Sequence, residues 1–144
     1  QKTSKPRLVP LGFIEKDGER KIVSSIRKKT TTQVEGLAMR RIDGSLFFGS
    51  TEHVMHEFKR ISAKHNHVLL DCGGINTIDM AGAELLVTLA DELREKGGGL
   101  YVFGMKRPIR QYLMRGKYWR AIETAHMFEE GMTAVEWFES QTKD

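Results

Sequence analysis

Short apolar runs alternate with amphipathic stretches along most of the chain. Leu37–Ile42, Val68–Cys72 and Leu100–Phe103 are short and rich in branched or aromatic side chains, which is typical of β-strands. The run at Val68–Cys72 is short and mostly apolar, as in a strand that is covered on both faces. A further run at Ala125–Phe128 predicts one more short strand near the end of the chain.

The stretches between these runs have the spacing of helices. The clearest is Met80–Lys96, whose apolar positions fall on one side of a helix; they are Gly82, Leu85, Leu86, Leu89, Ala90 and Leu93. Other helices are predicted from Ser50 or Thr51 to about Lys64, from Pro108 to near Gly116, and over Met132–Ser140. Strands that alternate with helices in this way predict parallel β-α-β units and an α/β sandwich.

The first part of the chain has a weaker pattern. Leu8–Phe13 predicts one short strand, and Pro10 confines that strand to the edge of a sheet. We interpret the charged, threonine-rich segment Lys16–Thr32 as a mobile loop. Asp43–Gly44 predicts a tight turn, and Leu46–Phe48 is a second short apolar run after it.

The net charge of +4 is unevenly distributed. Residues 1–30 carry nine Lys/Arg against three acids, a balance of +6, so the remaining residues sum to −2. We therefore divide the chain into a basic N-terminal arm with an edge strand, residues 1–35, and a folded domain, residues 36–144. Such an arm is typical of a cytoplasmic segment beside a membrane helix, although a solvated tail has the same composition. We expect no nucleic-acid partner, because those domains carry their cations on a folded face.

A length of 144 residues predicts one domain with a core that needs neither a disulfide nor a metal. The single cysteine, Cys72, excludes an internal disulfide framework and fits a reducing compartment. No apolar run approaches the roughly 20 residues of a membrane span. The chain begins with Gln1, so we expect it to be a piece of a longer protein.

The stretch from Val68 to Gly82 is the most informative part of the sequence. A buried strand leads through a short polar loop to a helix that opens at Asp79, whose carboxylate caps the first turn. The small residues behind it leave the first amides and the positive end of the helix dipole accessible. We therefore predict a partner-binding site at this helix start, made of Thr77, Asp79, Met80, Ala81 and Gly82.

Three segments together carry a resemblance to a known family. The first, Val68–Ala83, joins an apolar run, an aspartate, a short turn and Ile-Asp-Met-Ala-Gly. In the second, the glycines Gly97–Gly99 precede Leu-Tyr-Val-Phe-Gly, and the third, Pro108–Leu113, opens a helix. They resemble the STAS domain, which sulfate permease (SulP) anion transporters share with bacterial anti-sigma-factor antagonists. The resemblance covers roughly Gly36–Phe138. It implies a STAS-type α/β sandwich, with a mixed, mostly parallel sheet of four to five strands and amphipathic helices.

Two further segments look like the transporter branch of this family. Arg40–Gly49 reads Arg-Arg-Ile-Asp-Gly-Ser-Leu-Phe-Phe-Gly, and Pro6–Gly12 resembles the linker that follows the last membrane helix. The resemblance implies a cytoplasmic, non-catalytic regulatory and protein-interaction domain of a SulP-type sulfate or related anion transporter. Its partner would be the transmembrane part of the same transporter, at the cytoplasmic face of the cell (inner) membrane.

The helix start departs from the family pattern. In the antagonist branch, the residue after the signature aspartate is a serine that a partner kinase phosphorylates. Met80 and Ala81 stand there in this chain, and neither has a hydroxyl to accept phosphate. Thr77 precedes the aspartate and is a poor substitute by position. The resemblance thus implies a binding module without the usual phosphorylation switch, with a regulatory protein at the Met80 helix start.

A second basic feature follows the last predicted core strand. No acidic residue occurs between Glu95 and Glu123, and this interval holds Lys106, Arg107, Arg110, Arg115, Lys117 and Arg120. On a membrane-attached domain, such a stripe would face anionic lipid or the transporter's cytoplasmic surface. A solvated helix flank is the alternative interpretation.

Other candidate sites have simpler interpretations. His53, His56, His65 and His67 lack a second ligand pair at metal-site spacing, so we interpret them as surface histidines. Cys72 has only Asp71 as a charged neighbour, which disfavours the thiolate and predicts an inert thiol. Asp71 and Asp79 have structural roles as a strand-end acceptor and a helix cap. We therefore predict that the domain is not an enzyme and holds no cofactor.

Two alternative functions stay open. A free-standing anti-sigma-factor antagonist in a partner-switching circuit has the same fold, although Met80 and Ala81 argue against it. A nucleotide-binding domain is the other, since some family members are thought to bind nucleotides. The glycines of this chain match neither the P-loop nor the dinucleotide-binding fingerprint, so no residue is assigned to a nucleotide.

Overall fold

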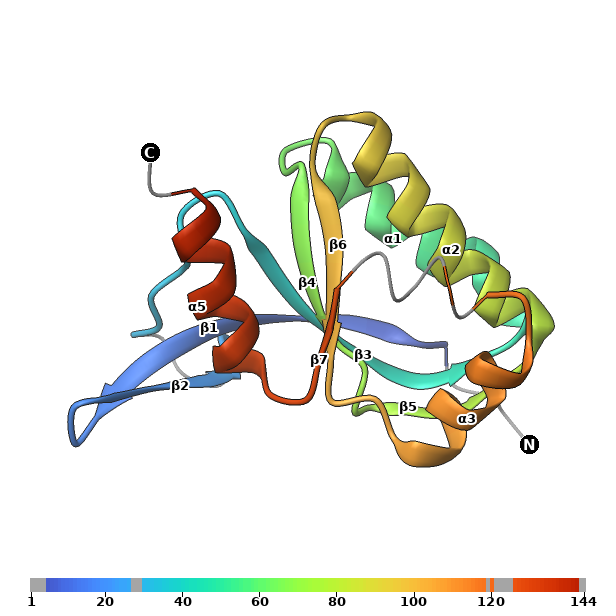
Figure 1. The fold of residues 1–144 in the computed structure, drawn as a ribbon, viewed down its shortest axis with the longest axis horizontal. Coiled ribbons are helices and arrows are strands. Elements are labelled where there is room, and N and C mark those ends of the chain that lie inside the picture. The colour runs from blue at the N-terminus through green and yellow to red at the C-terminus, as the bar shows by residue number, and fades with distance from the viewer. Residues whose placement is uncertain (1–4, 27–29, 119, 121–125, 143–144) are drawn as a thin grey trace.

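A computed structural model describes residues 5–26, 30–118, 120 and 126–142 (Figure 1). It contains one mixed sheet, with the order β2-β1-β3-β4-β6-β7 and with β5 paired to β3. The pairs β3–β4, β4–β6, β6–β7 and β3–β5 are parallel, and β1 runs antiparallel to both of its neighbours. The predicted α/β class and mostly parallel sheet are confirmed.

The strands in the described part of the chain are β1 (Arg7–Lys16), β2 (Glu19–Ser24), β3 (Ala38–Leu46), β4 (His67–Asp71), β5 (Ile75–Ile78), β6 (Gly99–Phe103) and β7 (Met127–Phe128). The helical segments are the 3-10 turn η1 (Phe48–Ser50), α1 (Thr51–Ser62), α2 (Met80–Glu95), α3 (Arg107–Arg115) and α5 (Gly131–Gln141). This sheet has seven strands, more than the four to five expected, because β2 and β5 lie in segments predicted as loops. Ala125, the expected start of the last strand, lies outside the described residues.

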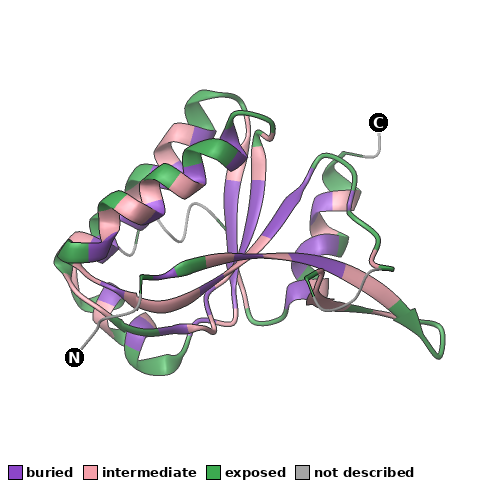
Figure 2. Ribbon diagram, turned by 180° about the vertical axis from the view of Figure 1, so that it is seen from behind, coloured by how far each residue is buried: buried purple, intermediate pink, exposed green. Residues whose placement is uncertain are grey.

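Helices cover both faces of the sheet, as Figures 1 and 2 show. On one face, α1 and α2 pack Phe58 and Leu86 against the even-numbered residues of β4, Val68 and Leu70. On the other face, α5 packs Phe138 and its neighbours against Leu69 of β4. The alternating residues of β4 therefore enter two separate cores, which explains why its three central residues are all apolar.

The N-terminal segment joins the same sheet. Asp17 and Gly18 have φ angles of 54° and 81°, the left-handed pair that a two-residue hairpin turn requires. The turn pairs β2 with β1, so the prediction of a loop over Lys16–Thr32 was wrong for Glu19–Ser24. β1 lies between β2 and β3, so the prediction of an edge strand was wrong. β3 pairs with β1 up to Pro10, and β2 pairs with β1 from the next residue on.

A bidentate ion pair fastens this hairpin to the end of the chain. Arg20 Nη1 and Nη2 donate to the two carboxylate oxygens of Glu139 on α5, at 2.9 and 2.8 Å. Arg20 also lies over the ring of Phe13, 5.3 Å from its centroid. These contacts join β2 to α5 across almost the whole length of the sequence.

The middle of the chain also differs from the prediction. β3 runs through Asp43 and Gly44 instead of turning there, because Gly44 N donates to Gly74 O at 2.9 Å and β5 pairs beside it. Gly44 has a φ of 125°, and the register shifts between Gly44 and Leu46. Leu46 is fully buried, whereas Phe48 in η1 is 79% exposed. The apolar run is thus the end of a strand followed by an outward turn.

Candidate functional site

The first turn of α2 is held by the carboxylate of Asp79. Its Oδ1 accepts a hydrogen bond from Gly82 N at 2.9 Å, as predicted for a helix cap. Its Oδ2 accepts one from Phe48 N at 3.0 Å, a contact that the sequence did not predict. The backbone N–H of Asp79 donates to Leu46 O at 3.2 Å. One residue therefore joins the end of β3, the η1 turn and the start of α2.

Gly82 lies inside this junction. A Cβ atom built on it would come within 2.2 Å of Leu46 O and 2.9 Å of Ile78 Cγ1. Because those neighbours include a backbone carbonyl, even one methyl group would push α2 away from β3. The absence of a side chain at Gly82 thus allows α2 to pack on the sheet, and its N–H is occupied by Asp79.

The other residues of the predicted helix-start site are more accessible. Thr77 on β5 is exposed, Ala81 is half-buried, and Met80 keeps 59% of its side chain exposed. Phe48, whose backbone N–H is bound by Asp79, is 79% exposed, so two large apolar residues next to the cap in the chain or by hydrogen bond are open to solvent. Exposed apolar side chains that lie together are typical of interaction surfaces.

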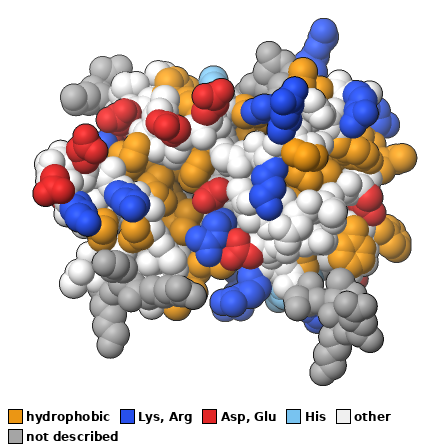
Figure 3. Space-filling model, turned by 90° about the horizontal axis from the view of Figure 1, so that it is seen from below, with side chains coloured by type: hydrophobic (Ala, Val, Ile, Leu, Met, Phe, Trp, Pro, Cys, Tyr) orange, Lys and Arg blue, Asp and Glu red, His pale blue; other side chains and the backbone are white. Residues whose placement is uncertain are grey.

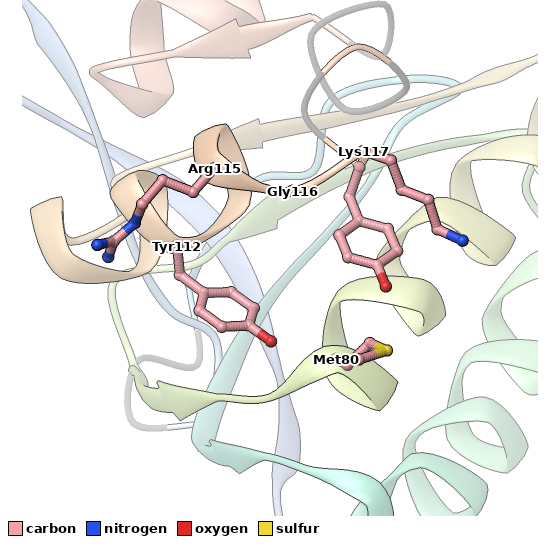
Figure 4. A pocket seen from close by; sticks show the side chains of 6 residues that line it. Met80, Tyr112, Arg115, Gly116 and Lys117 are labelled. Atoms are coloured by element: carbon pink, nitrogen blue, oxygen red, sulfur yellow. The ribbon is translucent and has the colours of Figure 1, made fainter.

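Met80 forms one wall of a hollow of about 610 Å³ between the start of α2 and the end of α3. The opposite wall is formed by Tyr112 and Arg115 of α3 and by the turn that follows, Gly116, Lys117 and Tyr118. Figure 4 shows the Tyr112 hydroxyl pointing toward Met80, whereas the Arg115 and Lys117 side chains extend outward on opposite sides. The hollow thus brings together the predicted helix-start site and part of the predicted basic stripe.

The turn after α3 is tied back to α2. Tyr118 is 9% exposed and its hydroxyl donates to Glu84 Oε1 of α2 at 3.3 Å. Burial and the Glu84 carboxylate both raise the pKa of Tyr118, so its hydroxyl keeps the donated proton. Lys117 Nζ lies 5.8 Å from the centroid of the Tyr118 ring. These contacts fix the second wall of the hollow.

The residues of the predicted basic stripe lie on α3 or next to its two ends in the chain. Lys106 Nζ donates to Asn76 Oδ1 at 3.1 Å, and Arg115 Nε donates to the Gln111 carbonyl at 3.3 Å. Arg107, Lys117 and Arg120 are exposed, and Arg110 is half-buried. Seen from below, cations gather over the end of the molecule that holds α3, and carboxylates gather over the opposite end, that of the β1–β2 hairpin and α5 (Figure 3).

The other polar candidates have structural surroundings. Asp71 Oδ1 accepts a hydrogen bond from Gly73 N at 2.8 Å, and burial raises the pKa of this carboxyl. Burial and, as the smaller cause, the Asp71 charge together raise the pKa of the Cys72 thiol to about 12, so the thiolate is disfavoured. His67 Nδ1 lies 2.8 Å from the Tyr101 hydroxyl. Within the described ranges, no group of three His, Cys, Asp or Glu side chains could hold a metal ion.

Comparisons with known proteins agree on one family and one fold. A family model described as STAS domain matches residues 28–131. The structure of the murine Solute Carrier 26 family member A9 anion transporter matches with a TM-score of 0.83 at 14% identity, over 96% of this chain and 23% of that chain. No curated protein sequence matches. No helix in the described part of the chain is both long and apolar enough to span a bilayer.

Smaller proteins with the same fold cover less of this chain. A sulfate transporter family protein from Wolinella succinogenes matches with a TM-score of 0.69 at 16% identity, over 85% of this chain and 100% of that one. A putative anti-sigma factor antagonist from Thermotoga maritima matches with a TM-score of 0.62 at 13% identity, over 72% of this chain and 88% of that one. At these identities the likeness concerns the fold.

Proposed function

The chain belongs to the STAS domain family, and on that premise we propose that it is the cytoplasmic regulatory and protein-interaction domain of a SulP-type anion transporter. The extent of the fold supports the transporter branch. The match to the murine transporter spans 96% of the chain, against 72% for the antagonist from Thermotoga maritima. The chain spans only 23% of that transporter, so ion transport itself would belong to the rest of the parent protein.

The exposure of Met80 is the observation that carries the docking part of this proposal. Met80 opens α2 and is 59% exposed, so much of its apolar surface is left in solvent. A flexible apolar side chain in that position suits a protein surface better than a charged ligand. The domain would then stabilise, assemble or gate the membrane part through the start of α2, and the exposed cations of α3 would extend the contact.

The domain would act without a phosphorylation switch and without catalysis. Met80 and Ala81 offer no hydroxyl, and Thr77 lies on β5 before the cap. We expect mass spectrometry of the protein from its native host to find no phosphate on peptides that span residues 67–94. Stoichiometric phosphate on Thr77 would instead support an antagonist-like mechanism.

A transport assay on the full-length parent tests the docking role. Met80→Glu places a charge on the proposed contact surface, so we expect reduced anion uptake or reduced assembly with an unchanged unfolding midpoint of the 144-residue chain. Met114→Glu is the matched control, since Met114 is 55% exposed and does not line the hollow. Normal uptake and normal membrane levels in Met80→Glu would contradict the proposal.

A further inference from the structure

The hollow beside Met80 combines an apolar interior with a cationic rim. Its lining includes one large apolar and two aromatic residues, Met80 from α2, Tyr112 from α3 and Tyr118 from the turn after α3. Arg115 and Lys117 stand at its edge and extend outward on opposite sides (Figure 4). A concave apolar site with a few polar groups at its margin is the usual form of a pocket that receives a ligand group.

The charges at this rim are not balanced locally. In the described part of the chain, neither Arg115 nor Lys117 forms an ion pair. The carboxylate beside the hollow, that of Glu84, accepts the hydrogen bond from Tyr118. Lys106 and Arg107 continue the positive surface at the start of α3, where Lys106 contacts only the neutral amide of Asn76. The rim therefore favours an anionic partner.

We propose that this hollow binds an acidic peptide segment that carries one large apolar side chain. This inference rests on the proposed interaction role of the domain and names the chemistry of its partner. The apolar side chain enters between Met80 and Tyr112. Because Arg115 and Lys117 point to opposite sides, carboxylates both before and after that side chain are needed to pair with them.

The shape of the site favours a peptide over a membrane. A bilayer accepts apolar side chains that protrude from a protein, whereas Tyr112 and Tyr118 line a concave surface. The site also differs from one built for a small inorganic anion, because its cations are exposed at the rim and its interior is apolar. An acidic segment with an apolar anchor satisfies both parts of the site at once.

Fluorescence anisotropy with designed peptides tests this inference on the 144-residue chain. The probe is fluorescein-labelled Asp-Glu-Asp-Ser-Phe-Glu-Asp-Glu. One control peptide replaces every acid by its amide, a second replaces Phe by Ser, and two more keep acids on only one side. We expect all four controls to bind more weakly than the probe, and the two one-sided peptides to lose up to about fivefold in affinity, since an exposed ion pair contributes up to about that factor. Equal binding of the probe and any of these controls would overturn the proposal.

Paired variants locate the binding. Met80→Asp and Lys117→Glu should each weaken the probe by about five- to tenfold. Met114→Asp and Lys64→Glu make the same changes on exposed residues outside the hollow and should leave the affinity unchanged. Equal losses in both members of a pair would mean that the peptide binds through overall charge, which contradicts a defined site.

Vesicles test the rival occupant. We expect the chain to sediment no better with vesicles of phosphatidylserine and phosphatidylcholine than with phosphatidylcholine alone. Sedimentation that depends on phosphatidylserine and is lost in Met80→Asp, without peptide binding, would assign the surface to the membrane and overturn the inference. Failure here is distinct from failure of the proposed function: the uptake defect of Met80→Glu would remain if only the peptide chemistry is wrong.

Discussion

The two walls of the hollow are built in different ways. The α2 wall is fixed by the fold, since Asp79 accepts two backbone N–H groups and Gly82 leaves no space even for a methyl group. The α3 wall is anchored from below by Ile109 and Leu113, which are buried, while its charged side chains reach into solvent. The position of the first wall is therefore constrained by the core, whereas the charge of the second can change at little cost to stability.

This difference separates where a partner binds from which partner binds. A substitution at Gly82 or Asp79 alters the geometry of the sheet and the helix together, so its effect on binding cannot be separated from its effect on folding. A substitution at Arg115, whose Nε donates to a carbonyl of its own helix, mainly changes the electrostatic complementarity of the rim.

The largest loss of stability is expected from a substitution in the core beneath α2. Leu86 is 1% exposed and packs between α2 and the sheet, so Leu86→Ala should lower the free energy of unfolding by about 2–5 kcal/mol. Thr88→Ala, on the exposed side of the same helix, is the control and should change it by less than about 0.5 kcal/mol. Denaturant unfolding measures both. A loss below about 0.5 kcal/mol for Leu86→Ala would mean that α2 does not cover the sheet in this way.

Gly82→Ala tests the close approach of α2 to β3. Alanine normally stabilises a helix interior by about 1 kcal/mol relative to glycine. The contact with Leu46 O at 2.2 Å reverses that sign here, and we expect a net loss of about 1–3 kcal/mol from overpacking. Denaturant unfolding shows which of the two effects is larger. A Gly82→Ala variant that is more stable than the original chain would be incompatible with the close contact to Leu46 O.

Asp79 tests the junction at the start of α2. Asp79→Ala removes the acceptor of two backbone N–H groups and should cost about 1–2 kcal/mol. Asp79→Asn keeps one acceptor oxygen and should recover part of that loss. Hydrogen exchange at the Phe48 amide should speed up in Asp79→Ala, because its partner is then gone. Unchanged exchange would show that the second hydrogen bond of Asp79 does not protect that amide.

The smallest effect on stability is expected at the α3 wall. Arg115→Glu reverses a charge on an exposed side chain that donates a hydrogen bond to a carbonyl of its own helix, so the free energy of unfolding should change by less than about 0.5 kcal/mol. Thermal and denaturant unfolding both measure this. A loss above about 1 kcal/mol would show that the second wall is as constrained as the first, and the comparison between them would fail.

Much of the fold was predictable because its central elements are strongly patterned. The α2 helix has seven buried positions at helical spacing, and β4 is apolar on both faces. The two strands that were missed are short and partly polar, and their pairing partners lie elsewhere in the chain. β2 depends on β1 and on the ion pair of Arg20 with Glu139, although Asp17-Gly18 was a local signal for its hairpin.

The candidate site was predictable only in parts. The methionine in place of a serine at the helix start and the run of cations after Glu95 are both visible in the sequence. Nothing in the local sequence indicates that Met80 and part of this run line the same hollow. Their meeting depends on the turn after α3, which folds back so that Tyr118 bonds Glu84 across 34 positions. Gly82 was interpreted as room for a partner, because a sequence does not reveal that the Leu46 carbonyl already fills that space.

The bidentate ion pair between Arg20 and Glu139 can form only late in the synthesis of the chain. The two residues lie 119 positions apart, and the N-terminal hairpin leaves the ribosome first. Until α5 emerges, the sheet face that holds Leu11 and Tyr101 lacks its cover. A nascent chain stopped before residue 131 therefore exposes an apolar face of the sheet to proteases and chaperones. This exposure ends only when α5 has been synthesised and packs on that face.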